Sequence, residues 1–279
     1  MNHALGDLRR RVLRRWICWW MRRRLDVRKL ELTRLGDAGA GWTLPTSKIL
    51  SDTTAVCVGA GEDITFDVEL NKKGINVFTI DPTPRAKAHV GLVLAAAASG
   101  SSAPINNSQA DFYDLHGFDR RRFTFLDIGL WNANTSKRFF APRDPNCVSH
   151  SIVNLQRTTN GFEAKCMTLQ SICEAMSIKK IQILKLDVEG AEYAVLKNIV
   201  DTGLLPEVLC VEFDEAANPL NLRAMKRIDE VIGLLKQAGY AFLHCEYGNA
   251  LFIRGDSSQI TLSASAAGTS SEQVLASAR

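Results

Sequence analysis

The 279-residue chain lacks the long apolar runs and the internal repeats that several protein classes require. Its longest uncharged apolar run near the start covers residues 16–21, whereas a bilayer-spanning helix needs about 20 such residues and a signal-peptide core about 7–15. No segment recurs at a fixed period, which excludes solenoids and propellers. With 8 Pro, 19 Gly and 46% hydrophobic residues, the chain is neither disordered nor collagen-like. The sequence therefore predicts a globular protein.

Cysteine and histidine are too scattered to form a zinc site. The chain has seven Cys and five His, and it contains no Cys-x-x-Cys pair. An odd number of cysteines, several of them inside apolar runs such as residues 56–58, is typical of buried thiols in a reducing compartment. We therefore predict a cytoplasmic protein without a bound metal.

Charge is distributed unevenly along the chain. Residues 1–34 hold 11 of the 34 Lys and Arg but 3 of the 30 Asp and Glu, which leaves 23 basic and 27 acidic residues in the remainder. A mildly acidic body argues against a nucleic-acid partner. Apolar residues recur at helical spacing among the arginines of the first segment: Leu5, Leu8, Val12, Trp16 and Trp20. This pattern predicts either a helix at a membrane surface or a solvated charged helix.

The rest of the chain divides into residues 35–254 and a Ser/Ala-rich end at residues 255–279, which we expect to be a flexible tail. Between residues 54 and 254, short apolar runs alternate with amphipathic stretches, which is typical of parallel strands joined by helices. The expected strands are residues 55–58, 76–80, 123–128, 181–186, 208–213, 240–244 and 250–253, with 138–141 as a companion of the strand at 123–128 in a hairpin-like insertion. The pattern predicts an α/β fold: a Rossmann-like, doubly wound, mostly parallel seven-stranded sheet.

Polar residues follow the apolar runs at the ends where such a sheet binds ligands. They are Gly59, Gly61, Asp81, Asp127, Asp187, Glu189, Glu212 and Asp214. Gly59 and Gly61 allow a tight turn against a ligand, and Asp81 is placed to accept hydrogen bonds from ribose hydroxyls. These residues predict a cofactor that carries a nucleoside.

The first turn distinguishes between two kinds of nucleoside cofactor. A dinucleotide site would have a third glycine at position 64, which is Ile64, and the turn carries Glu62 and Asp63 instead. Two carboxylates would repel a pyrophosphate, but they suit a cofactor with an ammonium and a cationic sulfur. S-adenosylmethionine therefore fits better, with Gly59, Gly61, Glu62, Asp81 and Asp127 as candidate contacts.

An eleven-residue run, Ile183-Leu184-Lys185-Leu186-Asp187-Val188-Glu189-Gly190-Ala191-Glu192-Tyr193, resembles the signature of the FkbM-type methyltransferases. Residues 81–84 and 129–131 are similar to that family's segments after strands two and three, and the resemblance covers roughly residues 50–255. It implies a class I, S-adenosylmethionine-dependent enzyme, usually an O-methyltransferase acting on a hydroxyl of a sugar, lipid or secondary metabolite.

Methyl transfer to a hydroxyl requires alignment of the oxygen and removal of its proton. Asp187 and Glu189 are the candidates for accepting that proton or orienting the hydroxyl, although both could instead favour the start of the following helix. His150 lies in the segment where a lid over the acceptor is expected, and a neutral imidazole can act as a base. Glu212 and Asp214 could join Asp187 around a divalent cation or be solvated strand-end carboxylates.

Three alternatives remain open at this point. Trp131, Phe139 and Phe140 could stack on a ligand or pack in the core. Tyr193 and Lys197 form the Tyr-x-x-x-Lys pattern of short-chain dehydrogenases, but position 180, where a partner serine is expected, is a lysine. The third alternative is a non-catalytic module that attaches to a membrane or an anionic partner through residues 1–34.

Overall fold

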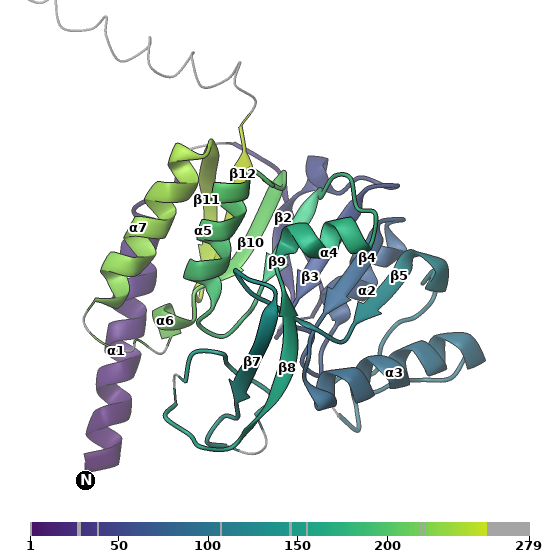
Figure 1. The fold of residues 1–279 in the computed structure, drawn as a ribbon, viewed down its shortest axis with the longest axis horizontal. Coiled ribbons are helices and arrows are strands. Elements are labelled where there is room, and N and C mark those ends of the chain that lie inside the picture. The colour runs from purple at the N-terminus through teal and green to yellow at the C-terminus, as the bar shows by residue number, and fades with distance from the viewer. Residues whose placement is uncertain are drawn as a thin grey trace, which may run out of the picture.

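A computed structural model of the chain describes residues 2–26, 29–37, 39–106, 108–144, 147–154, 156–217, 219, 221 and 223–255. The predicted tail lies outside the described residues from position 256 onward. Helices and strands of the described part form one layered structure (Figure 1).

The core is a seven-stranded sheet in the order β11-β12-β10-β9-β3-β4-β5. Its strands are β3 (Thr54–Val58), β4 (Asn76–Ile80), β5 (Phe123–Leu126), β9 (Ile183–Leu186), β10 (Val208–Glu212), β11 (Tyr240–Glu246) and β12 (Asn249–Arg254). The five strands from β10 to β5 are parallel, and β12 runs antiparallel to both β10 and β11. The predicted Rossmann-like fold is thus confirmed.

The strands are apolar on both sides because helices cover both faces of the sheet. On β3, Val56 and Val58 face one core and Ala55 and Cys57 face the other, as the two-residue period of a strand requires. The first core is covered by α1 (Asn2–Arg22), α4 (Leu169–Ala175), α5 (Glu192–Thr202) and α7 (Ala224–Gln237). The second is covered by α2 (Thr65–Lys72), α3 (Pro84–Ser99) and the hairpin of β1 (Leu32–Leu35) and β2 (Trp42–Pro45).

A smaller sheet inserted after β5 changes one prediction. It contains β6 (Gly129–Leu130), β7 (Thr135–Phe140) and β8 (Gly161–Met167), in the order β6-β8-β7, below the central sheet in Figure 1. The segment at residues 138–141 therefore pairs with β8 and not with the strand at 123–128. Strand β8 was not predicted because several of its side chains are exposed, which leaves little apolar signal.

Helix α1 packs against the sheet through residues next to the apolar stripe that the sequence shows. Ile17 and Met21 are at most 1% exposed in the first core, whereas Val12 and Trp16 are 60% and 49% exposed. The buried stripe is thus offset by one position, about 100° around the helix. In the described part of the chain, no helix is long and apolar enough to cross a bilayer.

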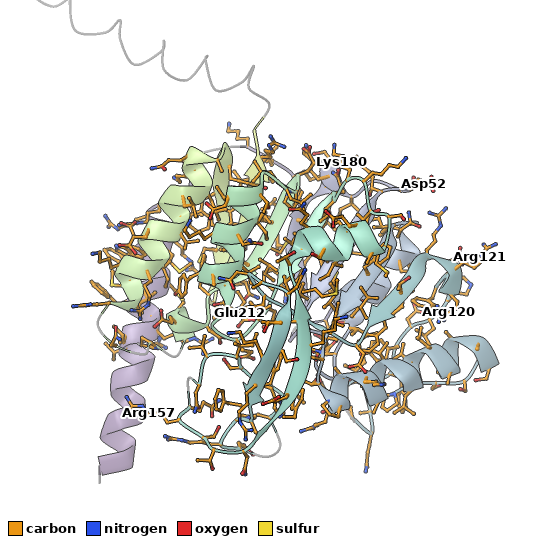
Figure 2. All side chains as sticks on the ribbon, viewed as in Figure 1. Asp52, Arg120, Arg121, Arg157, Lys180 and Glu212 are labelled. Atoms are coloured by element: carbon orange, nitrogen blue, oxygen red, sulfur yellow. The ribbon has the colours of Figure 1, made fainter. Side chains whose placement is uncertain are left out.

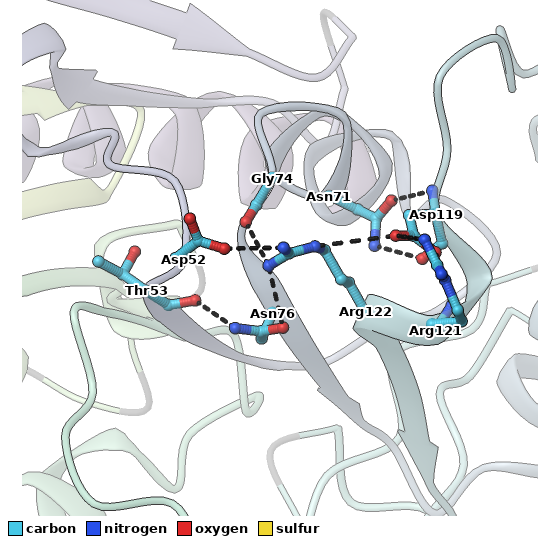
Figure 3. A network of polar contacts seen from close by, with 8 residues as sticks. All are labelled: Asp52, Thr53, Asn71, Gly74, Asn76, Asp119, Arg121 and Arg122. Carbon is cyan, nitrogen blue, oxygen red and sulfur yellow. Dashed lines mark hydrogen bonds and ion pairs between the residues drawn. The ribbon is translucent and has the colours of Figure 1, made fainter.

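A polar network joins the amino ends of β4 and β5 (Figure 3). The Arg122 guanidinium donates to the Gly74 carbonyl over 3.0 Å, lies 2.7 Å from an Asp52 carboxylate oxygen and contacts Asp119 at 3.8 Å. The Asn71 side chain also binds both backbone groups of Asp119. Figure 2 shows that Asp52 and Glu212 lie at opposite ends of the sheet, so this network is remote from the carboxyl ends of the strands.

Candidate active site

A cavity of about 350 Å³ lies at the carboxyl ends of β3, β4 and β9. Residues of the inserted sheet and of the segment that precedes β8 line it on one side. The lining includes residues 58–63, 80–83 and 185, together with Asp187, Val188, Glu189, Gly129, Leu130, Phe139, Val148, Ser149, His150 and Ile152. This is where the sequence placed the ligand site.

Gly59 and Gly61 form the turn after β3 in the left-handed region, with φ of +87° and +52°. A Cβ atom on Gly59 would lie 2.1 Å from the carbonyl oxygen of Asp187, so the turns after β3 and β9 touch through backbone atoms. The Asp187 amide also donates to the Val58 carbonyl over 3.2 Å. Glycine is thus required here by both conformation and space.

Asp81 holds this glycine turn in place. Its Oδ2 accepts hydrogen bonds from the amides of Ala60 (2.9 Å) and Gly61 (3.0 Å), and its Oδ1 accepts from the amide and hydroxyl of Thr83 (2.7 and 2.6 Å). Four bonds fill the accepting capacity of a carboxylate. A ribose hydroxyl would therefore have to share Asp81 with these protein donors.

The first turn of α2 has its backbone donors occupied by the protein. Asp63 accepts from the Thr65 amide over 2.9 Å, and the Ile64 amide donates to the Tyr113 hydroxyl over 2.9 Å. Glu62 is bound by the Arg85 guanidinium. A pyrophosphate would need those amides free. The site thus fits S-adenosylmethionine, which carries no phosphate, better than a dinucleotide.

Asp187 and Glu189 both line the cavity from the turn after β9. The Asp187 side chain is 32% exposed, and its Oδ2 lies 3.5 Å from the Lys185 ammonium. Glu189 has a φ of +50°, a conformation that costs a non-glycine residue free energy, and its carbonyl accepts a short hydrogen bond from the Ser151 hydroxyl. The residue that precedes α5, Ala191, provides no side-chain cap.

Further carboxylates crowd the same end of the sheet. Burial raises the pKa of Glu192 to about 8 and that of Asp214 to about 11. One buried oxygen of each has no hydrogen-bond partner among the residues that the structure describes. The charge of Asp187, followed by burial, raises the pKa of Glu212. Burial and then Asp187 also raise the pKa of Glu189. Among the described residues, no three acidic, His or Cys side chains are arranged to hold a metal.

His150 reaches the cavity from the loop that precedes β8. Its Nδ1 lies 2.9 Å from the Val148 carbonyl oxygen, and its ring meets the edge of Phe162 at a centroid distance of 5.4 Å. Because a carbonyl can only accept, the hydrogen of a neutral ring must be on Nδ1. Nε2 is then the atom that can accept a proton.

Several candidates lie outside the lining of this cavity. Asp127 is held by the Lys87 ammonium at 2.6 Å. Glu212 and Asp214 do not line the cavity, and of the three aromatic candidates only Phe139 does. The dehydrogenase pair does not converge, because the Tyr193 hydroxyl donates to Glu215 and the Lys197 ammonium contacts Asp201.

Two side chains of the site were missed from the sequence. Lys185 is 4% exposed at the floor of the cavity, and its signal was available as a lysine inside the apolar run Ile-Leu-Lys-Leu. Ser151 belongs to a segment without periodicity, so no sequence pattern marks its contact with the turn after β9.

The fold is that of the Rossmann-like α/β class with a cavity at the carboxyl ends of its strands, and comparisons with known proteins give the family. The model of the Methyltransferase FkbM domain matches residues 56–242, and the chain therefore belongs to the FkbM methyltransferase family. S-adenosylmethionine is accordingly its methyl donor. None of the curated proteins compared with the chain matches it.

Two solved structures are distantly similar to this chain. One is the fibrillarin pre-rRNA processing protein of Methanococcus jannaschii, at 10% identity and a TM-score of 0.39, which covers 82% of this chain and 84% of its own. The other is a TehB-like SAM-dependent methyltransferase from Corynebacterium glutamicum, at 9% identity and a TM-score of 0.32, with 74% and 82% covered.

Proposed function

We propose that the chain is an O-methyltransferase that transfers the methyl group to a hydroxyl of a small molecule, such as a sugar, lipid or secondary metabolite. The observation that carries this proposal is the position of Asp187 and Glu189 on the wall of the cavity, with Nε2 of His150 available as a proton acceptor. A hydroxyl is a weak nucleophile unless its proton is removed as the new bond forms.

In this proposal the cavity divides into a holding part and a reacting part. Backbone atoms of Gly59 and Gly61, with Glu62 and Asp81, hold the donor, and Asp127 can join them by leaving Lys87. When bound, S-adenosylmethionine supplies an electrophilic methyl group on a cationic sulfur. Carboxylates near that sulfur stabilise its charge, and the side of the cavity that the inserted sheet lines excludes water.

Asp187 is the proposed group that accepts the hydroxyl proton. Its carboxylate lies on the wall that the glycine turn touches, so a hydroxyl bound to it would be directed at the donor. Glu189 would accept the proton of the same hydroxyl or orient that hydroxyl, and His150 is the second candidate base. Holding the oxygen in line with the methyl group supplies much of the rate increase in such displacements.

Two substitutions test this assignment. Asp187→Asn should leave the affinity for S-adenosylhomocysteine unchanged in calorimetry and lower kcat about 10²- to 10⁴-fold, the range for loss of a general base. Asp81→Ala should abolish cofactor binding without unfolding the domain. Normal turnover of Asp187→Asn with the true acceptor would remove Asp187 from the mechanism. The acceptor can be found by transferring labelled methyl groups into a host-cell extract and identifying the product.

We also propose that α1 contacts an anionic membrane surface. Val12, Trp16 and Trp19 are 60%, 49% and 49% exposed and lie at i, i+4 and i+7 on one side of the helix. Exposed arginines flank them, including Arg15 and Arg23, and the chain has no acidic residue between positions 7 and 26. Half-exposed tryptophans beside arginines suit the interface of a bilayer with anionic lipids.

The membrane proposal predicts sedimentation of the full chain with phosphatidylserine vesicles and weaker sedimentation with phosphatidylcholine vesicles. The variant Trp16→Ser/Trp19→Ser should lose most of this binding. Leu92→Ser is the matched control, because Leu92 is 55% exposed on α3 and lies away from α1. Equal sedimentation of the wild type and the double variant would contradict the proposal.

A further inference from the structure

A buried lysine connects the two turns that form the cavity. Lys185 lies on β9 with a side chain that is 5% exposed. Its ammonium donates a short hydrogen bond to the Gly59 carbonyl and lies 3.5 Å from the Asp187 carboxylate. One cation therefore contacts both the turn that receives the donor and the proposed proton acceptor.

A small buried polar group interacts electrostatically with this ammonium. Asp67 on α2 is 2% exposed, accepts a 2.5 Å hydrogen bond from the Thr79 hydroxyl and neighbours Cys57. Burial disfavours a charged Lys185, but the carboxylates of Asp187 and Asp67 outweigh it and raise the lysine's pKa. Lys185 is thus an ammonium at neutral pH.

Asp187 also interacts with several other carboxylates. Burial and the charge of Asp187 contribute to a raised pKa of Glu189 in the same turn, Glu212 on β10, Glu192 on α5 and Asp214 on α6 (Asp214–Ala217). A cation beside one carboxylate of such a group favours the charged form of that carboxylate.

We propose that Lys185 is a positioning residue whose ammonium holds the Asp187 carboxylate in its charged form at the cavity wall. The same ammonium fixes the turn after β3 through Gly59, so the charge of the proton acceptor and the place of the donor are set together. This inference rests on the proposed role of Asp187 in methyl transfer. The competing explanation is that Lys185 only neutralises buried Asp67.

The charge of Asp187 can be followed without any activity. In ligand-free full-length protein, the ¹³C signal of the Asp187 carboxyl, assigned by its loss in Asp187→Asn, should titrate about 1–3 pH units higher in Lys185→Met than in the wild type, the range for removing an opposite charge at this distance. The acidic limb of the pH–rate profile should move by the same amount. Lys197→Met, which removes an exposed lysine on α5, is the control and should leave both unchanged.

A double variant separates the two explanations. In Lys185→Met/Asp67→Asn the buried aspartate no longer needs a cation, so this protein should fold even if the single variant does not. Its Asp187 signal should still titrate at higher pH. A titration equal to that of the wild type would overturn the inference. A shifted signal with an unshifted pH–rate profile would support the role of Lys185 and instead remove Asp187 as the proton acceptor.

Discussion

The two ends of the central sheet differ in how their charged side chains are paired. At the amino ends, the Arg122 guanidinium is matched by Asp52, Asp119 and the Gly74 carbonyl (Figure 3). At the carboxyl ends, acidic side chains gather around Lys185, and in the described part of the chain one buried oxygen each of Glu192 and Asp214 has no hydrogen-bond partner. Groups that only stabilise a fold are expected to be paired, whereas unpaired buried groups persist where function requires them.

The backbone differs between the ends in the same sense. At the amino ends, Gly74 has a φ of +79° in a turn, a conformation that glycine adopts readily. At the carboxyl ends, Glu189 occupies the left-handed region without being glycine, held by the Ser151 hydroxyl. Unfavourable backbone and crowded charge thus coincide at the cavity, which is the pattern of a functional site.

We expect the largest effect from replacing a glycine by alanine at each end of the central sheet. In Gly59→Ala the new Cβ would lie 2.1 Å from a backbone oxygen at positive φ, so we expect a loss of stability of about 3–5 kcal/mol or failure to fold. In Gly74→Ala the nearest atom is the Ser51 Cβ at 3.2 Å, and the cost should be about 1–2 kcal/mol. Urea unfolding measures both, and equal losses would contradict the contrast.

Removing the cation at the amino ends should affect stability alone. Arg122→Met deletes the contacts with Gly74, Asp52 and Asp119 and should lower the free energy of unfolding by about 1–3 kcal/mol, the cost of leaving partly buried polar groups unpaired. Affinity for S-adenosylhomocysteine should stay unchanged, because the network lies at the opposite end from the cavity. A calorimetric loss of affinity in a folded variant would show that the two ends are coupled.

We expect the buried acidic side chains at the carboxyl ends of the strands to make the free energy of unfolding depend on pH. Because the pKa of Glu192 is raised from 4.5 to about 8, the folded protein keeps a proton that the unfolded chain releases. Its contribution is therefore complete below pH 4.5 and is lost as the pH rises to about 8, at up to about 1.4 kcal/mol per pH unit. Glutamine does not titrate, so in Glu192→Gln the free energy of unfolding should fall less steeply with pH, by about that slope.

Chemical denaturation at several values between pH 5 and pH 8 measures this slope. Glu230→Gln is the matched control, since Glu230 is exposed on α7 beside Lys226 and should leave the slope unchanged. If Glu192→Gln and Glu230→Gln give the same pH dependence as the wild type, Glu192 does not keep a proton in the folded protein.

Most of the fold could be predicted because burial on both faces leaves a strong signal. The runs that became β4, β9 and β10 are almost wholly apolar, and each lies within about two residues of its expected place. Strand β8 and the hairpin of β1 and β2 are partly exposed, so no such run marks them. On α1, Val12 and Ile17 belong to two neighbouring apolar stripes, and only packing against the sheet determines which of the two is buried.

The candidate site was predicted in part for a similar reason. Residues that directly follow a strand, such as Gly59, Asp81 and Asp187, are placed by topology alone. What they bind could not be predicted, because the hydrogen bonds that fill Asp81 come from a turn whose shape depends on its own contacts. Contacts between distant segments, such as Ser151 with Glu189, leave no trace in a single sequence.

The smallest effect is expected at the exposed pair of Lys87 and Asp127. Both side chains are solvated, with 63% and 43% exposed, so Asp127→Asn should change the free energy of unfolding by less than about 1 kcal/mol. Its effect on S-adenosylhomocysteine affinity should also be at most severalfold, because the carboxylate must leave Lys87 to reach the donor. A loss as large as that of Asp81→Ala would place Asp127 among the main cofactor contacts. The carboxylate that follows β5 would then be a functional group and not only an ion-pair partner of Lys87.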